Sequence, residues 1–193
     1  MTPAQMAADL QRVARGLPNA IRASLVEVGT RGERLVKEGY LSGNRLAVRS
    51  GRLRNSVTTA ITDAPPTMEL AAGRARGAPV RYAQVLEDGG VIVPKRGKFL
   101  AIPVRGGPAT TAAGVTKAGW ESPRTAPVKL RFVRTVRGGI LVLDKKKSST
   151  VVYRLVRSVK IAGRHYMRDA GALMTEAFPV VLSGRIAALF GAA

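Results

Sequence analysis

The chain has 193 residues, and its 32 Lys and Arg residues against 12 Asp and Glu residues give a net charge of +20 at pH 7. Because 46% of the residues are apolar, the chain can bury a core, which argues against a wholly disordered protein. Cysteine is absent and histidine occurs once, at His165. These counts exclude disulfides, thiolate zinc sites and multi-histidine metal sites, so we expect no cofactor.

The start of the chain lacks the features of a targeting segment. The first ten residues have no basic stretch followed by an apolar run, which is the pattern of a secretion signal. We also expect no window to approach the roughly 20 apolar residues that span a bilayer. The sequence therefore predicts a soluble, unsecreted protein with no membrane partner.

Helical periodicity opens the chain. Thr2 followed by Pro3 is typical of a helix start, with an N-cap and a proline at the first helical position. The apolar residues that then share one helical face are Met6, Leu10, Val13 and Leu17. The pattern continues over residues 18–39, although three glycines weaken it. We predict one or two amphipathic helices over the first 39 residues.

A basic segment at residues 41–56 separates these helices from a predicted hairpin. Ser50 is a candidate cap for a short helical turn in this segment. The β-branched run at residues 57–62, the Pro65-Pro66 turn and the run at residues 68–72 have the pattern of two strands joined by a turn.

The middle of the chain combines a short helix, a strand and a long loop. Residues 80–90 have the spacing of a helix closed by glycine, and residues 99–104 suit a strand. Pro103 places that strand at a sheet edge or at its own end. Glycine and proline recur without periodicity over residues 105–127, which is unusual within a compact domain. We predict an extended loop or arm there, and it contains Trp120, the only tryptophan.

Strand patterns return at residues 129–136, 140–143 and 151–161. Residues 164–190 then have the pattern of a long helix, which Pro179 should kink or interrupt. The chain is therefore expected to be α+β, with N-terminal amphipathic helices, a small, mostly antiparallel sheet with a short helix, and a long C-terminal helix. At this length we predict a single domain over residues 1–193.

Catalytic motifs are missing from the sequence. It contains no Walker-type phosphate loop, no H-E-x-x-H zinc helix and no G-x-S-x-G nucleophile elbow. The adjacent carboxylates Glu87 and Asp88 would not face each other on a helix, so they indicate a polar helix end. His165 has no evident partner, which indicates a position in a turn or the core. We therefore expect no enzymatic activity.

The candidate contact residues are cationic or aromatic. A cluster without acidic residues comprises Arg45, Arg49, Arg52 and Arg54, and it is either a solvated basic face or a surface for nucleic acid or an acidic partner. Trp120 is either a core residue or an interface anchor, since tryptophan is enriched in binding hot spots. Arg164 and Tyr166, at the start of the last helix, complete the candidate set for a partner or subunit interface.

Three segments in succession resemble a known family. They are Arg49-Ser-Gly-Arg-Leu-Arg-Asn-Ser-Val57, Tyr82-Ala-Gln-Val-Leu-Glu-Asp-Gly-Gly90 and Ile161-Ala-Gly-Arg-His-Tyr-Met-Arg-Asp-Ala170. After the N-terminal amphipathic helix, this order resembles tailed-phage neck and tail-completion (head-tail joining) proteins of the minor tail protein Z-like kind. The third segment differs from the family, which more often has proline and phenylalanine there, and the insertion at 105–127 is longer than the family pattern.

The resemblance implies a structural virion protein, located at the head-tail junction and assembled in the host cytoplasm. It also implies a homo-oligomer, a hexameric ring, between the portal or adaptor protein and the tail tube or tail terminator protein, with viral DNA passing through the lumen. The net charge and the clustered arginines favour an alternative, a basic nucleic-acid-binding protein. Against that alternative, only 5% of residues are aromatic and no recognised nucleic-acid-binding motif is present.

Overall fold

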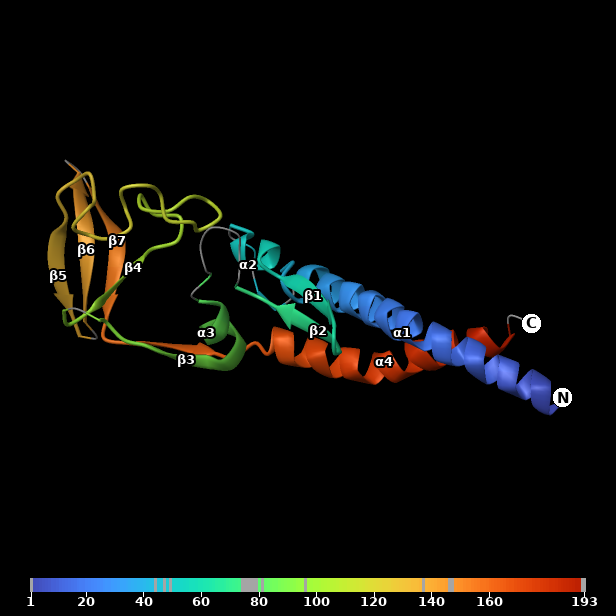
Figure 1. Ribbon diagram of the computed structural model, residues 1–193. Coiled ribbons are helices and arrows are strands. Elements are labelled where there is room, and N and C mark those ends of the chain that lie inside the picture. The colour runs from blue at the N-terminus through green and yellow to red at the C-terminus, as the bar shows by residue number, and fades with distance from the viewer. Residues whose placement is uncertain are drawn as a thin grey trace. The chain divides into compact units, whose positions relative to one another are not determined.

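The computed structural model describes residues 2–43, 45–46, 48, 50–73, 80, 82–95, 97–136, 138–145 and 148–191. The chain forms two compact units where the sequence predicted one domain (Figure 1). Unit 1 comprises Met1–Asp88 and Arg164–Ala193, and unit 2 comprises Gly89–Gly163. The division arises because the strands of residues 89–163 pair only with one another in the part that is described. The α+β class is confirmed.

Unit 1 begins with one long helix. Helix α1 spans Pro3–Arg34 and continues without a break into a π-helical segment, η1, at Leu35–Tyr40. Thr2 is its N-cap, as predicted: the Thr2 hydroxyl accepts from the Gln5 amide at 3.3 Å, and the Gln5 side chain accepts from the Thr2 amide at 2.8 Å. These two bonds form a capping box.

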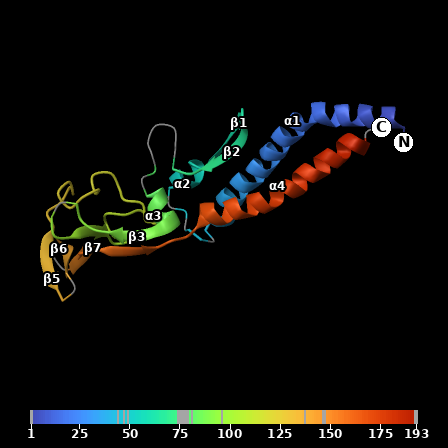
Figure 2. The ribbon, with the colours of Figure 1, turned by 60° about the horizontal axis from the view of Figure 1, so that its bottom comes forward.

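Helix α4, Tyr166–Gly191, packs beside α1 (Figure 2). The glycines of α1 do not end it; two of them allow close packing instead. A Cβ at Gly32 would overlap the Met174 side chain, and one at Gly16 would lie 2.8 Å from Leu189 Cδ2. Pro179 was predicted to kink or interrupt this helix; the interruption is wrong, because α4 is continuous through Pro179. The carbonyl that loses its amide partner is that of Thr175, which is exposed and can bond to water.

The close approach at Gly32 predicts a stability difference between two matched variants. We expect Gly32→Val to destabilise the protein by about 1 to 3 kcal/mol more than Gly171→Val, because the new side chain must displace Met174. Nothing lies within 4 Å of a Cβ at Gly171, and both sites are helical, so the difference isolates packing. Thermal unfolding followed by circular dichroism measures it. Equal melting temperatures would argue against a tight α1–α4 contact.

The rest of unit 1 covers the end of α1 and the start of α4. Strands β1, Thr58–Asp63, and β2, Pro66–Ala71, form the predicted hairpin. The short helix predicted in the basic segment is α2, Arg52–Asn55, but its N-cap is Gly51 with φ +69°, not Ser50. Helix α3, Ala83–Asp88, follows within the predicted range. The buried cluster that joins these elements comprises Val36, Leu41, Leu53, Val57, Val80, Ala83, Tyr166 and Ala170.

Unit 2 is built from antiparallel strands. One sheet has the order β4-β7-β6-β5, formed by Leu100–Pro103, Ser148–Val156, Gly138–Lys145 and Arg131–Thr135. Strand β4 is an edge strand ending in Pro103, as predicted. A second sheet pairs β3, Gly89–Ile92, with β8, Val159–Ala162. The sequence predicted a single strand over 151–161, whereas the chain passes there from one sheet to the other and forms two strands, β7 and β8. Strand β3 at residues 89–92 was not predicted.

The loop of residues 105–127 lacks helices and strands, as predicted, but it is not an extended arm. It folds against the β4-β7-β6-β5 sheet, where Ala109 is fully buried together with Val152 and Tyr153. A single bridge pairs Thr110 with Thr116. Trp120 packs partly buried against this cluster, and its carbonyl accepts from the Tyr153 hydroxyl at 2.7 Å. The structure thus places Trp120 at the core of unit 2.

Candidate functional site

Six of the seven candidate contact residues are among the residues that the structure describes. Arg52 and Arg54 are exposed on α2, and Arg49 lies outside the described residues. Trp120 belongs to unit 2. Arg45, Arg164 and Tyr166 lie around the start of α4. Among the described candidates of unit 1, hydrogen bonds join Arg45 to Arg164 and to the first turn of α4.

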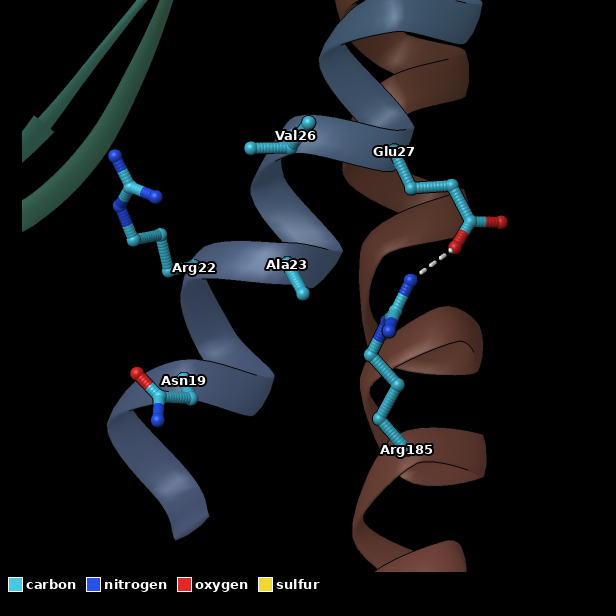
Figure 3. Close-up of a pocket in the computed structure, with 6 residues that line it drawn as sticks. All are labelled: Asn19, Arg22, Ala23, Val26, Glu27 and Arg185. Carbon is cyan, nitrogen blue, oxygen red and sulfur yellow. Dashed lines mark hydrogen bonds and ion pairs between the residues drawn. The ribbon is translucent and has the colours of Figure 1, made fainter.

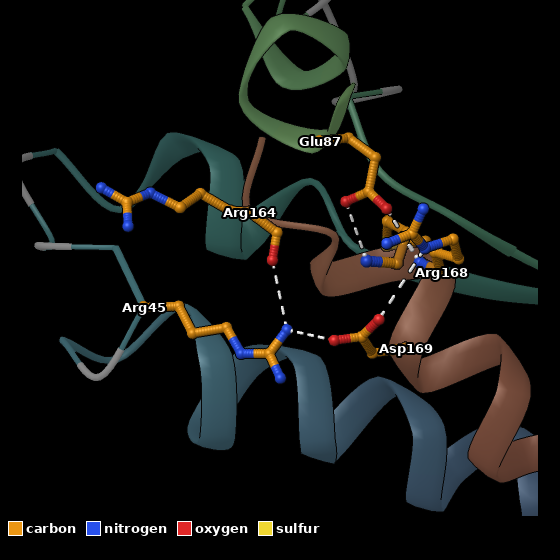
Figure 4. A network of polar contacts seen from close by, with 6 residues as sticks. Arg45, Glu87, Arg164, Arg168 and Asp169 are labelled. Atoms are coloured by element: carbon orange, nitrogen blue, oxygen red, sulfur yellow. Dashed lines mark hydrogen bonds and ion pairs between the residues drawn. The ribbon is translucent and has the colours of Figure 1, made fainter. Parts of the chain in front are cut away.

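Arg45 fastens the start of α4 to the segment that follows α1 (Figure 4). Its Nη1 atom donates to the Asp169 carboxylate at 2.5 Å and to the Arg164 carbonyl at 3.1 Å. The guanidinium carbon lies 3.9 Å from the centre of the Tyr40 ring, a cation–π contact. An arginine predicted to face a partner is thus engaged within its own chain, and the hydrogen bond to Asp169 raises the pKa of Arg45.

Glu87 caps α4, a role that sequence reasoning missed. Its carboxylate accepts from the Met167 amide and from the Arg168 amide, both at 2.9 Å (Figure 4). These amides belong to the first helical turn, where no intrahelical acceptor exists and a negative charge is favoured. The Glu87 carbonyl also accepts from the His165 amide at 3.1 Å. Glu87 lies about 80 residues before the helix that it caps, and no sequence pattern links the two segments.

His165 and Tyr166 have structural positions. His165 lies directly before α4, with φ +49°, where the sequence predicted a turn or the core. Tyr166 is 1% exposed, and its hydroxyl donates to the Ala83 carbonyl at 3.1 Å. Burial, with a smaller contribution from Glu87, raises the pKa of Tyr166 to about 12. The prediction of Tyr166 as an interface residue is therefore wrong, because the ring belongs to the core of unit 1.

The Arg45–Asp169 ion pair predicts acid sensitivity. The pKa of Asp169 is lowered from 3.8, chiefly by the hydrogen bond from Arg45. Because the folded-state pKa lies below the unfolded-state value, this contribution is fully present above about pH 4 and is lost as the pH falls through the folded-state pKa. We expect the unfolding free energy of the wild type to decline more steeply below this pH than that of Asp169→Asn. Urea titrations at several pH values measure both free energies. If those of the wild type and Asp169→Asn fell in parallel as the pH decreased, the stabilising role of the Arg45–Asp169 ion pair would be contradicted.

An open cavity of about 410 Å³ lies between α1 and α4 (Figure 3). Its lining residues are Asn19, Arg22, Ala23, Val26, Glu27 and Arg185. Arg185 Nη2 donates to Glu27 at 2.8 Å, and Arg22 Nε donates to Asp63 at 2.7 Å. The buried Nε of Arg185 has no hydrogen-bond partner within the described residues. Since both arginines already pair with carboxylates, the cavity is an ion-paired groove to which we assign no ligand.

Helix α4 is unusually apolar for its exposure. The segment Tyr166–Phe190 has 25 residues and a mean hydropathy of 1.4 in its most apolar window, which meets the length and composition of a membrane span. The expectation that no window approaches that composition is wrong for this helix. Core helices of soluble proteins reach the same values, but only 6% of this window is buried within the chain. Because α4 packs against α1 on one side, the apolar residues exposed on its other side, such as Val180, are the feature to explain.

The described residues offer little for metal or cofactor binding. Among them, no group of three or more His, Cys, Asp or Glu side chains could hold a metal ion. At the start of α4, Glu87 accepts from two backbone amides, and Arg45 bonds to a backbone carbonyl and to Asp169. These contacts hold the segments around residues 45 and 87 to the start of α4. No family model, curated protein or solved structure matches the chain.

Proposed function

We propose that this protein is a non-enzymatic structural subunit of a tailed-phage virion. In this role it is a ring-forming neck or tail-completion protein that joins the head connector to the tail tube. The proposal follows from the order of the three segments that resemble this family. It also agrees with the contacts described above, which hold the fold together.

The observation that carries the proposal is where those three segments meet. Leu53 of the first, Ala83 of the second and Tyr166 of the third belong to one buried cluster. Glu87 of the second segment caps the helix that the third segment opens. Three weak motifs far apart in the chain thus form one packing unit, as expected if together they encode a shared fold.

The uncovered apolar surface of α4 supports the same proposal. A monomeric soluble protein seldom leaves a large contiguous apolar surface in water, and such surfaces mark interaction sites. An assembly subunit covers the surface when it joins its neighbours. An interaction role accounts for the apolar helix, whereas catalysis would not require it.

A null mutant of the phage that encodes the chain tests this function. Electron microscopy of the mutant lysate is expected to show heads and tails that fail to join, and plasmid-supplied protein should restore complete particles. Antibody labelling of restored particles should mark the head-tail junction. Complete and infectious particles in the absence of the protein would refute the proposal.

Nucleic-acid binding is the second candidate, favoured by the exposed Arg52 and Arg54 on α2 and by the net charge of +20. Binding that depends on phosphate contacts weakens steeply as salt rises. A steep salt dependence of DNA binding, combined with absence of the protein from purified particles, would favour this candidate over the virion subunit.

A further inference from the structure

The face of α4 that points away from α1 is apolar and carries no cation. Met174, Arg185 and Leu189 meet α1 on the inner side. The outer side includes Val180 and Ala187, which lie seven residues apart and so follow one seam along the helix. Leu173 lies at the border of this side, where it lines a hollow with Val28 and Arg31 of α1. Val180 is 71% exposed. The exposed positions from 172 to 190 include one carboxylate, Glu176, and no Lys or Arg.

The start of α1 presents a second uncovered apolar stripe. Gly16 lies against Leu189, close to the end of α4 at Gly191. The residues of α1 before Gly16 are mostly exposed, including Met6 at 52% and Leu10 at 54%. These two residues belong to the apolar helical face that the sequence predicted. Isolated helices of this length are marginal in water, so a partner on this stripe would stabilise it.

Two other occupants fit these faces poorly. A bilayer around α4 would also receive α1, whose Glu27 and Arg31 form an ion pair that extends to Arg185. A charged side chain at the bilayer centre costs roughly 2.5 to 3.5 kcal/mol or more. An acidic partner, in turn, would be drawn to the basic remainder of the surface and not to a face without cations.

We propose that the start of α1 in one copy of this chain packs against the outer face of α4 in the next copy. This inference rests on the proposed assembly role and names the surfaces that serve it. Copies with a charge of +20 repel each other, and they approach most easily where one partner presents no cation. The exposed Arg15 near the α1 stripe complements Glu176 on the α4 face. Because the two faces differ, the contact is head-to-tail, and contacts of this kind can close into rings.

Sedimentation velocity of the full-length protein tests this contact. We expect the wild type to form oligomers, and Leu10→Glu and Val180→Glu each to weaken association at least about tenfold, because a carboxylate would be buried without a partner. An equimolar mixture of the two variants retains one intact pair of faces and should form a two-chain complex. Val136→Glu, a change of the same kind at an exposed site in unit 2, should behave as the wild type. Both altered side chains are exposed, so circular dichroism should show native folding.

Several outcomes would overturn the inference. They are a wild type that stays monomeric at all concentrations, variants that associate like the wild type, and a mixture that forms no two-chain complex. Flotation of the wild type with phosphatidylcholine vesicles, lost in Val180→Glu, would assign the face to lipid. A monomeric protein found in virions would reject this contact and leave the proposed function standing. A protein that forms oligomers in solution but is absent from virions would reject the proposed function and leave this contact standing.

Discussion

Tyr166→Ala should destabilise the protein by about 3 to 5 kcal/mol, as typical for removal of a large buried aromatic side chain. Tyr166 is 1% exposed and lies in the cluster that joins the segments around α2, α3 and α4. Typical domains have only about 5 to 15 kcal/mol of stability, so much of the variant is expected to be unfolded near physiological temperature. Urea unfolding followed by circular dichroism measures the change.

Two matched variants separate packing from hydrogen bonding at this position. Tyr166→Phe removes only the hydroxyl that donates to the Ala83 carbonyl, so we expect a loss of about 1 kcal/mol. Tyr82→Ala makes the same truncation at an exposed tyrosine of unit 1 and should cost far less than Tyr166→Ala. If Tyr166→Ala were as stable as Tyr82→Ala, the buried position of Tyr166 in the cluster of α2, α3 and α4 would be wrong.

Glu87→Ala should destabilise the protein by about 1 to 3 kcal/mol, since the amides of Met167 and Arg168 lose their acceptor at the first turn of α4. Amide hydrogen exchange of these two residues should accelerate more than exchange at the middle of α4. The loss tests the cap itself, because the helix contacts further along α4 stay unchanged.

Asp88→Ala is the matched control for this cap. It removes the same charge from the neighbouring residue, whose side chain is exposed. We expect it to change the unfolding free energy by less than about 0.5 kcal/mol. Equal effects of the two variants would mean that the overall charge, and not the capping geometry, stabilises the start of α4.

Local chemistry explains which parts of the fold the sequence predicts. The Thr2 cap, the hairpin of β1 and β2 and the edge position of Pro103 follow from residues within a few positions of each other. The α+β class follows from the order of such elements. In each case a cap, a turn or a missing amide donor determines the local structure, so the pattern is sufficient.

Long-range pairing explains the failures. Strand β7 has a register shift opposite Leu141 and Val142, and the consecutive residues Val152 and Tyr153 are both buried. A bulge re-aims side chains, so simple alternation could not predict that both would enter the core. Glu87 and Tyr166 acquire their roles from segments about 80 residues distant, and no local pattern encodes such a contact.

The candidate contact residues show the same limit in another form. Charge and residue type drew attention to Arg45 and Tyr166, but the structure uses them inside unit 1. The apolar pattern of residues 164–190 predicted a long helix but not which of its apolar residues the chain covers, and 6% of its most apolar window is buried within one chain. Periodicity identifies a face that needs covering, and it cannot tell whether the same chain or a neighbouring subunit covers it.

The copy number of the protein in purified virions tests the central claim most directly. Quantitative mass spectrometry of gradient-purified particles, with the major capsid protein as internal standard, should find a small, fixed number of copies per particle that matches a single ring. Particles that contain none of the protein, or trace amounts that vary between preparations and wash away with salt, would contradict a structural role at the head-tail junction.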